Sequence, residues 1–463
     1  MRIGIAPAWA LGLTLVFATG VEAQPPALVS QVRLANGLNV LFAPDTSATT
    51  VDVAVWYPAG TRWEPAGKSG MTHLLEGLMF SGSRRFGTGD HGRLVSAAGG
   101  LANTFTTPDY SCFYETLPPS GLDLALQLEA DRMASLTLDQ RRIDAAKRQA
   151  MAARRASAGE NSPIGRGLRE LYGQAWAGHP YRWPASGGGD DLSRLTLLDV
   201  TTYWKSHYGP DQTLLTVVGR FDPAVAEAAV RRAFEGVARR GAPVKPAASV
   251  GNGPRRVTRA TDAQVPLVLV GWRTPPDSSL DAIALDVLSR ALGSGPTARL
   301  RRDLVDSRHV CLLTQCQLDS RHDGGLFYVM AAVNPEADTS EVETAVLDEV
   351  EKLSGEALGD DELESAKHGA ETEMLMSWQT ARGLAQSLGA AQLDDGGWNA
   401  TASRLERLRR LSGADVSRAA ARTFVPAKRS VVWLMPGAAQ AAPRPPAKPR
   451  AMPARKPATG GKP

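Results

Sequence analysis

A histidine and a glutamate at helical spacing are the residues of this chain best suited to catalysis. They lie in the segment Met71-Thr72-His73-Leu74-Leu75-Glu76-Gly77-Leu78. Two histidines four residues apart share one face of a helix and can hold zinc, while a neighbouring glutamate activates a zinc-bound water. The order H-x-x-E-H marks one class of zinc peptidases. Here His73 and Glu76 are present, but Gly77 replaces the second histidine, so the motif is incomplete.

The hydrophobic pattern predicts the elements that position this segment. Asn36-Gly37, between the apolar runs of residues 32–42, predicts a β-hairpin. Further strands are predicted at Val51–Tyr57, within residues 104–117, at residues 265–272 and at Leu326–Val333, and a helix is predicted at residues 121–136. Strands and helices therefore mix along the chain, which indicates an α+β protein.

A faint internal repeat relates the two halves of the chain. Three matches share one offset: Leu168 with Leu384, Asp199-Val200 with Asp415-Val416, and Tyr208-Gly209-Pro210 with Phe424-Val425-Pro426. Each copy is typical of a helix, a proline-containing turn and a closing apolar strand. We therefore predict a tandem duplication, with an N-terminal domain at residues 28–238, a C-terminal domain at residues 255–436 and a linker between them.

The two ends of the chain differ from its centre. Arg2, an apolar run to Val21 and small residues before Gln24 predict a secretory signal peptide at residues 1–23, with an uncleaved membrane anchor as the alternative. Residues 437–463 are rich in Ala, Pro and Lys, which predicts a disordered tail. We expect an exported, periplasmic protein without a membrane span after signal cleavage.

Charge and cysteine content exclude two classes of protein. The formal net charge is only +4, and no stripe of basic and aromatic residues accompanies it, so no nucleic-acid partner is expected. The three cysteines, Cys112, Cys311 and Cys316, do not form a disulfide framework. If Cys311 and Cys316 share a strand, their odd spacing predicts side chains on opposite faces.

Several further motifs follow one another in a specific order. They are Asn36-Gly37-Leu38, Ala59-Gly60-Thr61-Arg62, the His73 segment, Gly99-Gly100-Leu101-Ala102-Asn103-Thr104-Phe105-Thr106, His179-Pro180-Tyr181 and Gly219-Arg220-Phe221-Asp222. In this order the chain resembles the peptidase M16 (pitrilysin/insulinase) family, in its short two-domain type similar to mitochondrial processing peptidase. The resemblance implies an α+β fold of two homologous domains, each a mixed β-sheet covered by helices, as in the LuxS/MPP-like metallohydrolases.

The resemblance also assigns roles by position. It implies His73 as the first zinc ligand, Glu76 as the general base, Gly77 as the second ligand position and Arg154 as the distal ligand position, which family members fill with glutamate. A supporting acidic position falls at Lys147. A guanidinium about 4 Å from a divalent cation costs roughly 8 kcal/mol at an effective dielectric near 20. We therefore expect no zinc here, and expect Arg154 to take the place of the metal beside Glu76.

Other positions bear on the same question. A replacement ligand could come from His91 or Asp109, although their spacing does not indicate it. Paired relatives without zinc keep an Arg/Tyr pair that holds substrate, and the resemblance places Val305 and Leu312 at those positions, with Arg308 as a substitute if the register shifts.

The segment at Asn103, Phe105 and Thr106 matches the strand that family members offer to an extended peptide substrate. The alternative is that Phe105 belongs to the core and Asn103 to a turn.

Three hypotheses for function remain open. The first is an exported, catalytically inactive family member that binds peptides or assembles with another M16 subunit or with itself, without a cofactor. The second is an active zinc metalloendopeptidase with rewired ligands. The third is an assembly scaffold without enzymatic activity.

Overall fold

The computed structural model describes residues 28–437, except residues 189, 244, 247, 252 and 296. The expected signal peptide and residues 438–463 of the expected tail lie outside the described residues. Within residues 28–437, no helix has both the length and the apolar composition needed to cross a bilayer.

Two β-sheets form the centre of the molecule. The first comprises β1 (Ser30–Arg33), β2 (Asn39–Pro44), β3 (Val51–Tyr57), β4 (Leu101–Thr106), β5 (Ser111–Leu117) and β6 (Leu214–Gly219). The second comprises β7 (Arg255–Thr261), β8 (Leu267–Arg273), β9 (Cys311–Asp319), β10 (Leu326–Val333) and β11 (Arg429–Pro436).

Fifteen α-helices are described around these sheets. In the first half they are α1 (Met71–Leu78), α2 (Asp90–Ala97), α3 (Leu122–Ser135), α4 (Gln140–Ala156), α5 (Ala158–Asn161), α6 (Pro163–Ala175), α7 (Asp191–Arg194), α8 (Leu197–His207) and α9 (Pro223–Phe234). In the second half they are α10 (Leu280–Gly293), α11 (Thr339–Lys352), α12 (Asp360–Ser377), α13 (Ala381–Asp394), α14 (Ala400–Arg410) and α15 (Gly413–Thr423). Short 3₁₀ or π turns lie at Thr61–Trp63, Pro119–Gly121, Pro180–Arg182, Pro210–Gln212, Arg301–Ser307 and Pro426–Lys428.

The two sheets repeat one topology. The first has the strand order β1-β2-β6-β3-β5-β4 and the second β7-β11-β8-β10-β9. In each sheet one parallel pair, β2 with β6 or β7 with β11, joins strands that are otherwise antiparallel. Even the capping boxes match, because Thr196 with Asp199 begins α8 as Ser412 with Asp415 begins α15. The mixed sheets and their helices confirm the predicted α+β class.

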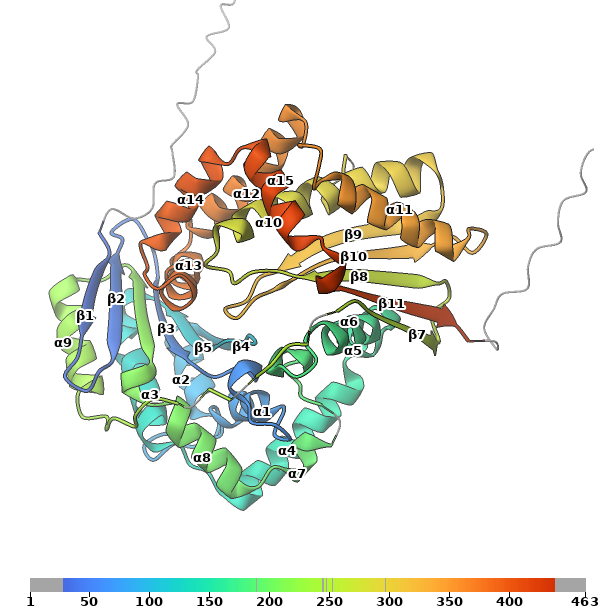
Figure 1. The fold of residues 1–463 in the computed structure, drawn as a ribbon. Helices are drawn as coiled ribbons and strands as arrows, with labels where there is room; N and C mark the ends of the chain where they lie inside the picture. Colours follow the sequence, from blue (N-terminus) through green and yellow to red (C-terminus); the bar gives the residue numbers. More distant parts are fainter. Residues whose placement is uncertain are drawn as a thin grey trace, which may run out of the picture.

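The two halves exchange one helix each. Helix α6 packs on β8 and β11 of the second sheet, and the equivalent α13 packs on β3 and β6 of the first. In Figure 1 both helices lie between the sheets. Leu171 of α6 is buried against Leu269 and Leu434, whereas Leu388 of α13 is buried with Trp56. Each half therefore completes the core of the other.

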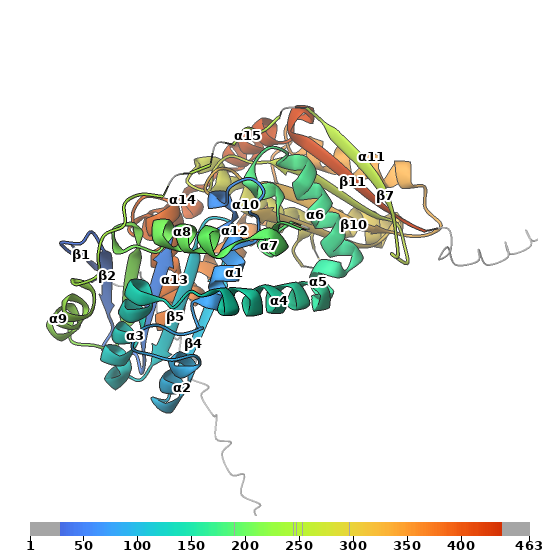
Figure 2. The same cartoon turned by 90° about the horizontal axis from the view of Figure 1, so that it is seen from below.

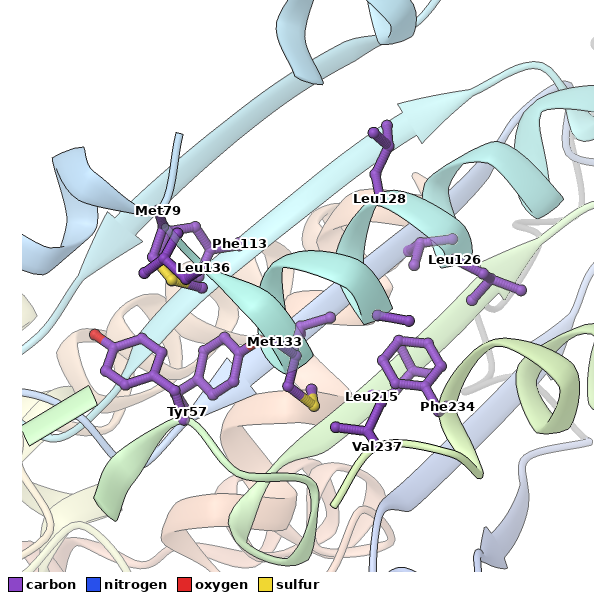
Figure 3. Packing of buried hydrophobic residues seen from close by; sticks show 14 of the residues in the cluster. Tyr57, Met79, Phe113, Leu126, Leu128, Met133, Leu136, Leu215, Phe234 and Val237 are labelled. Carbon is purple, nitrogen blue, oxygen red and sulfur yellow. The ribbon is translucent and has the colours of Figure 1, made fainter. Parts of the chain in front are cut away.

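The outer face of the first sheet carries the largest core cluster of that half. Side chains of α3, including Leu126 and Met133, pack with Phe113 of β5 and Leu215 of β6 (Figure 3). Helix α1 joins this core through Leu74, Leu75 and Leu78. It also packs against α4, which lies beside it in Figure 2.

The strand predictions hold closely, and one side-chain prediction is wrong. The predicted hairpin is β1–β2, and the predicted strands at Val51–Tyr57 and Leu326–Val333 are β3 and β10. Cys311 and Cys316 share β9 but contact the same core, not opposite faces. The reason is a bulge: Ala332 pairs with Leu313 and Val333 with Cys311, so Leu312 is left over and the alternation shifts by one.

Candidate functional site

Helix α1 presents one polar face. Met71, Leu74, Leu75 and Leu78 are buried, so residues 73, 76 and 77 point the other way. The carboxylate of Glu64 fixes the start of the helix by accepting hydrogen bonds from the main-chain nitrogens of Gly70 (2.9 Å) and Thr72 (2.8 Å). Burial raises the pKa of Glu64 to about 7, although these two hydrogen bonds favour the ionised form. The sequence motif is therefore placed on a well-anchored helix.

Two partners hold Glu76, the candidate base. Thr106 Oγ1 on β4 donates a 2.7 Å hydrogen bond to Glu76 Oε2, and His73 Nδ1 lies 3.5 Å from the same oxygen. Thr106 also lies 3.1 Å from Ser111 Oγ on β5. The hydrogen bond to Glu76 is the main cause that raises the pKa of His73, despite the opposing effect of burial. This contact favours the protonated form of His73.

Position 77 leaves space where a second ligand would stand. Gly77 is exposed, and among the described residues nothing outside its own helix would lie within 4 Å of a Cβ there. A histidine side chain at this position would therefore meet no obstacle close to the backbone. The missing ligand is a matter of residue type and not of crowding.

The two basic replacements lie on α4. Arg154 belongs to the last turn of α4 and lines a cavity beside α6. Lys147 donates a 2.8 Å hydrogen bond to the main-chain oxygen of Leu195, near the start of α8. The contacts described for Glu76 are those with Thr106 and His73, and the placement of Arg154 beside Glu76 stays a prediction.

The donor set does not fit zinc. Of the three ligand positions implied by the motif, only His73 has a side chain that can coordinate a metal, because position 77 is glycine and position 154 is arginine. A four-coordinate zinc site needs at least three protein ligands, and the positive charge of Arg154 opposes a dication. No hydrolytic step through a metal follows from these residues.

The candidate replacement ligands are engaged elsewhere. His91 Nε2 lies 2.7 Å from Glu115 Oε1 in the core, where Glu115 and Glu129 surround Arg132. Burial, followed by the charge of Arg132, lowers the pKa of His91 to about 4. Although His91, Glu115 and Glu129 have ligand atoms close together, Arg132 already supplies their positive charge.

Asp109 joins the two halves of the chain. Its carboxylate accepts hydrogen bonds from the hydroxyl of Tyr181 and, at 3.2 Å, from the main-chain nitrogen of His322 in the β9–β10 turn. Asp109 is therefore engaged in a contact between the first half of the chain and the β9–β10 turn of the second.

The positions implied for a substrate-holding pair carry apolar side chains. Val305 packs against the core of the second half, and Leu312 is 54% exposed on β9. Arg308 lies 3.0 Å from Asp303 on the surface.

Strand β4 is an edge strand beside the polar face of α1. It pairs with β5 and ends the first sheet. The Asn103 side chain is exposed and accepts a 2.8 Å hydrogen bond from the nitrogen of Thr104, whereas Phe105 packs edge-on against Trp56 and Tyr110. Phe105 thus supports the strand from its core side, and Thr106 faces Glu76.

Family models match most of the described chain. The model described as insulinase (peptidase family M16) matches residues 39–182, and the model described as peptidase M16 inactive domain matches residues 194–370.

Individual relatives agree with the family models. The chain is 28% identical over 360 residues to the zinc protease PqqE of Helicobacter pylori, covering 76% of this chain and 81% of that protein. An uncharacterised zinc protease of Mycobacterium leprae is 27% identical over 395 residues, covering 84% of this chain and 87% of the relative.

Solved structures show the same fold. A protease from Helicobacter pylori superposes with a TM-score of 0.82 at 26% identity, covering 88% of this chain and 99% of that one. A peptidase M16 inactive domain from Pseudomonas fluorescens superposes with a TM-score of 0.80 at 16% identity, covering 89% and 99%.

Proposed function

The chain belongs to the insulinase family of peptidases, peptidase family M16, and on that premise we propose that it is an exported pseudo-peptidase, which binds peptides or serves as the partner of an active M16 subunit. The observation that carries the proposal is the polar face of α1. An exposed glycine at position 77 and a carboxylate at position 76 that is held by Thr106 and His73 replace a metal-centred site.

Peptide binding is supported by the edge of the first sheet. An extended peptide can add to an edge strand through main-chain hydrogen bonds, and β4 offers such an edge directly beside α1. Phe105 packs against Trp56, while Asn103 and Thr106 lie at the positions that the family resemblance gives to substrate contacts. A peptide on β4 would pass Glu76 without meeting a metal.

A role as a partner subunit is supported by the family fold that surrounds the altered site. Helix α1 still packs against α4, and both halves keep the complete sheet topology. The predicted signal peptide implies export, and the expected partner is a zinc-bearing relative more than a second copy of this chain. Two such chains would enclose peptides between four homologous domains.

A second candidate function is a zinc peptidase with rewired ligands, because several similar proteins are named zinc proteases. Against it, His91 and Asp109 are both held in other contacts. The third candidate, an assembly scaffold, requires the same partner but no peptide.

One experiment separates these functions. The purified mature chain is mixed with fluorescent peptides, binding is measured by fluorescence anisotropy, and cleavage is measured by mass spectrometry of the same samples. The proposal predicts binding or partner assembly without cleavage. Cleavage that is lost in a Glu76→Gln variant and on chelation would overturn it.

Partner assembly has its own measurement. Co-expression with an M16 homologue that keeps H-x-x-E-H, followed by size-exclusion chromatography, should give one joint peak. Separate elution at micromolar concentration, together with an unchanged peptidase rate of the homologue, would contradict a partner role.

A further inference from the structure

A cavity lined by several arginines lies where the first half of the chain meets the second. It has a volume of about 620 Å³ and lies between α4, α6, the loop after Arg182 and strands β7 and β11. In Figure 1 α6 lies against these strands, and α5 connects it to α4. Arg154, at the distal ligand position that the family resemblance implies, forms part of its wall. The cavity therefore extends from the last turn of α4 to the second sheet.

Its lining has an excess of positive charge. Five arginines face two carboxylates, at Arg154, Arg166, Arg169, Arg182 and Arg259 against Glu170 and Asp262. Two of the arginines form ion pairs with these carboxylates. Arg166 pairs with Asp262, and a guanidinium nitrogen of Arg259 lies 3.0 Å from a carboxylate oxygen of Glu170. The two acids that line the cavity are thus already paired with arginines of the same wall.

The guanidinium groups of Arg169 and Arg182 are the ones that could bind an anion from outside the chain. Arg169 donates to the main-chain oxygen of Glu160, and no ion pair of Arg169 with a carboxylate is found among the described residues. Arg182 stacks on Trp183 at 4.4 Å, and its buried Nε has no hydrogen-bond partner within the described part of the chain. Burial, together with the charges of Arg154 and Arg166, lowers the pKa of Arg169 despite the nearby Glu160.

A second, smaller cavity of about 310 Å³ shares these two arginines. Leu168, Tyr172 and Trp183 give it apolar walls, and Glu160, whose carboxylate accepts a hydrogen bond from Ser186, also lines it. Arg169 and Arg182 thus stand between a basic cavity and an apolar one, an arrangement suited to an anionic group next to an apolar side chain.

We propose that Arg169 and Arg182 bind a carboxylate of a peptide ligand, either its C-terminal carboxylate or an Asp or Glu side chain. This inference rests on the proposed peptide-binding function and adds the ligand class to it. Guanidinium groups form paired, charge-assisted hydrogen bonds with carboxylates, and two of them that form no ion pair among the described residues provide such a receptor in one cavity. An apolar residue next to the carboxylate would occupy the smaller cavity.

Three peptides of equal length and common apolar sequence, labelled at the N-terminus, test this inference. The first has a free C-terminal carboxylate, the second is amidated but carries one glutamate, and the third is amidated and uncharged. Anisotropy titrations of the mature chain should show about tenfold tighter binding of at least one carboxylate peptide over the third. The preferred peptide identifies the source of the carboxylate.

Variants connect this preference to the cavity. Arg169→Gln and Arg182→Gln should each remove most of the preference, whereas Arg169→Lys should keep part of it. Arg232→Gln, which removes the same charge beside Asp123 on a distant face, is the matched control and should have no effect. Thermal unfolding of each variant shows that the fold is retained.

The possible failures are distinguishable. Equal binding of all three peptides, or an unchanged preference in both glutamine variants, overturns the carboxylate site but leaves peptide binding intact. No binding of any peptide overturns both the carboxylate site and the peptide-binding function.

Discussion

Thr106 on the edge strand and Glu76 on the motif helix are joined by a hydrogen bond of 2.7 Å. The hydroxyl donates to the carboxylate, so the candidate base is held by the strand that would receive a peptide. Ser111, which also contacts Thr106, donates a 2.8 Å hydrogen bond to the main-chain oxygen of Ala59 and extends this link into the loop before α1. Polar contacts thus connect the polar face of α1 to β4, to β5 and to the loop before α1.

Replacing Thr106 with valine should therefore reduce stability. The variant keeps the shape of the side chain but leaves Glu76 without its donor, which costs about 1 kcal/mol for a partly exposed hydrogen bond. Thr106→Ser retains the hydroxyl and is the control. Chemical denaturation measures both, and a valine variant as stable as the wild type would refute this role for the contact.

The exchanged helices predict opposite effects at two equivalent glycines. Gly389 of α13 lies against buried Trp56, and an added Cβ would overlap the indole ring, so Gly389→Ala should destabilise by about 1–3 kcal/mol. Gly173 of α6 has open space, so Gly173→Ala should be neutral or stabilising by up to about 1 kcal/mol. Thermal unfolding of both variants tests this, and losses of similar size would contradict it.

The contacts of Asp323 should make the stability of the fold depend on pH. Its carboxylate lies 2.9 Å from Arg62 and 2.7 Å from Lys245. Burial alone would raise the pKa of Asp323, but hydrogen bonds with His179, His322 and Lys245 and the charge of Arg62 outweigh it and hold the pKa well below its usual range. A lowered pKa stabilises the fold above the unfolded value of 3.8, and this contribution is lost as the pH falls toward the folded pKa.

Asp323→Asn should accordingly lower the free energy of unfolding at neutral pH by about 1–3 kcal/mol, after allowance for solvent screening. The difference from the wild type should shrink below pH 4. Asp348→Asn, at an exposed position on α11, is the control. Urea denaturation across this pH range measures the difference, and a constant difference down to acid pH would disprove the assignment.

Local sequence patterns were sufficient to predict much of the fold. Alternating and continuous apolar runs with Asn36-Gly37 predicted β1–β2 and β3, because turn chemistry and strand periodicity act within a few residues. The exchange of α6 and α13 was not predictable in this way. An apolar helix face indicates that Leu171 and Leu388 are buried but not which sheet they pack against.

The candidate site also combines features that local spacing predicts with contacts that it does not predict. Helical spacing placed His73, Glu76 and Gly77 on one face, as the structure has them. The bond from Thr106 to Glu76 joins residues far apart in sequence, and no local rule indicates it. Arg169 and Arg182 were also missed, since scattered arginines gain meaning only when α6 and the following loop line one cavity. The clustering of Arg166 and Arg169 on α6 was the available signal.

Restoring the lost ligands should restore metal binding. Gly77 is open to a larger side chain and α1 packs against α4, so the double variant Gly77→His with Arg154→Glu should hold about one zinc per chain. Each single variant is a control and should hold far less, because one ligand is still missing. A double variant that binds no zinc would mean that the two helices do not bring these positions together.

The zinc content of the unaltered mature chain tests the central claim most directly. The protein is equilibrated with zinc, dialysed against metal-free buffer and measured by inductively coupled plasma mass spectrometry. Our account predicts far less than one zinc per chain, and the same value for a His73→Ala variant. One tightly held zinc per chain that disappears in His73→Ala would contradict the account.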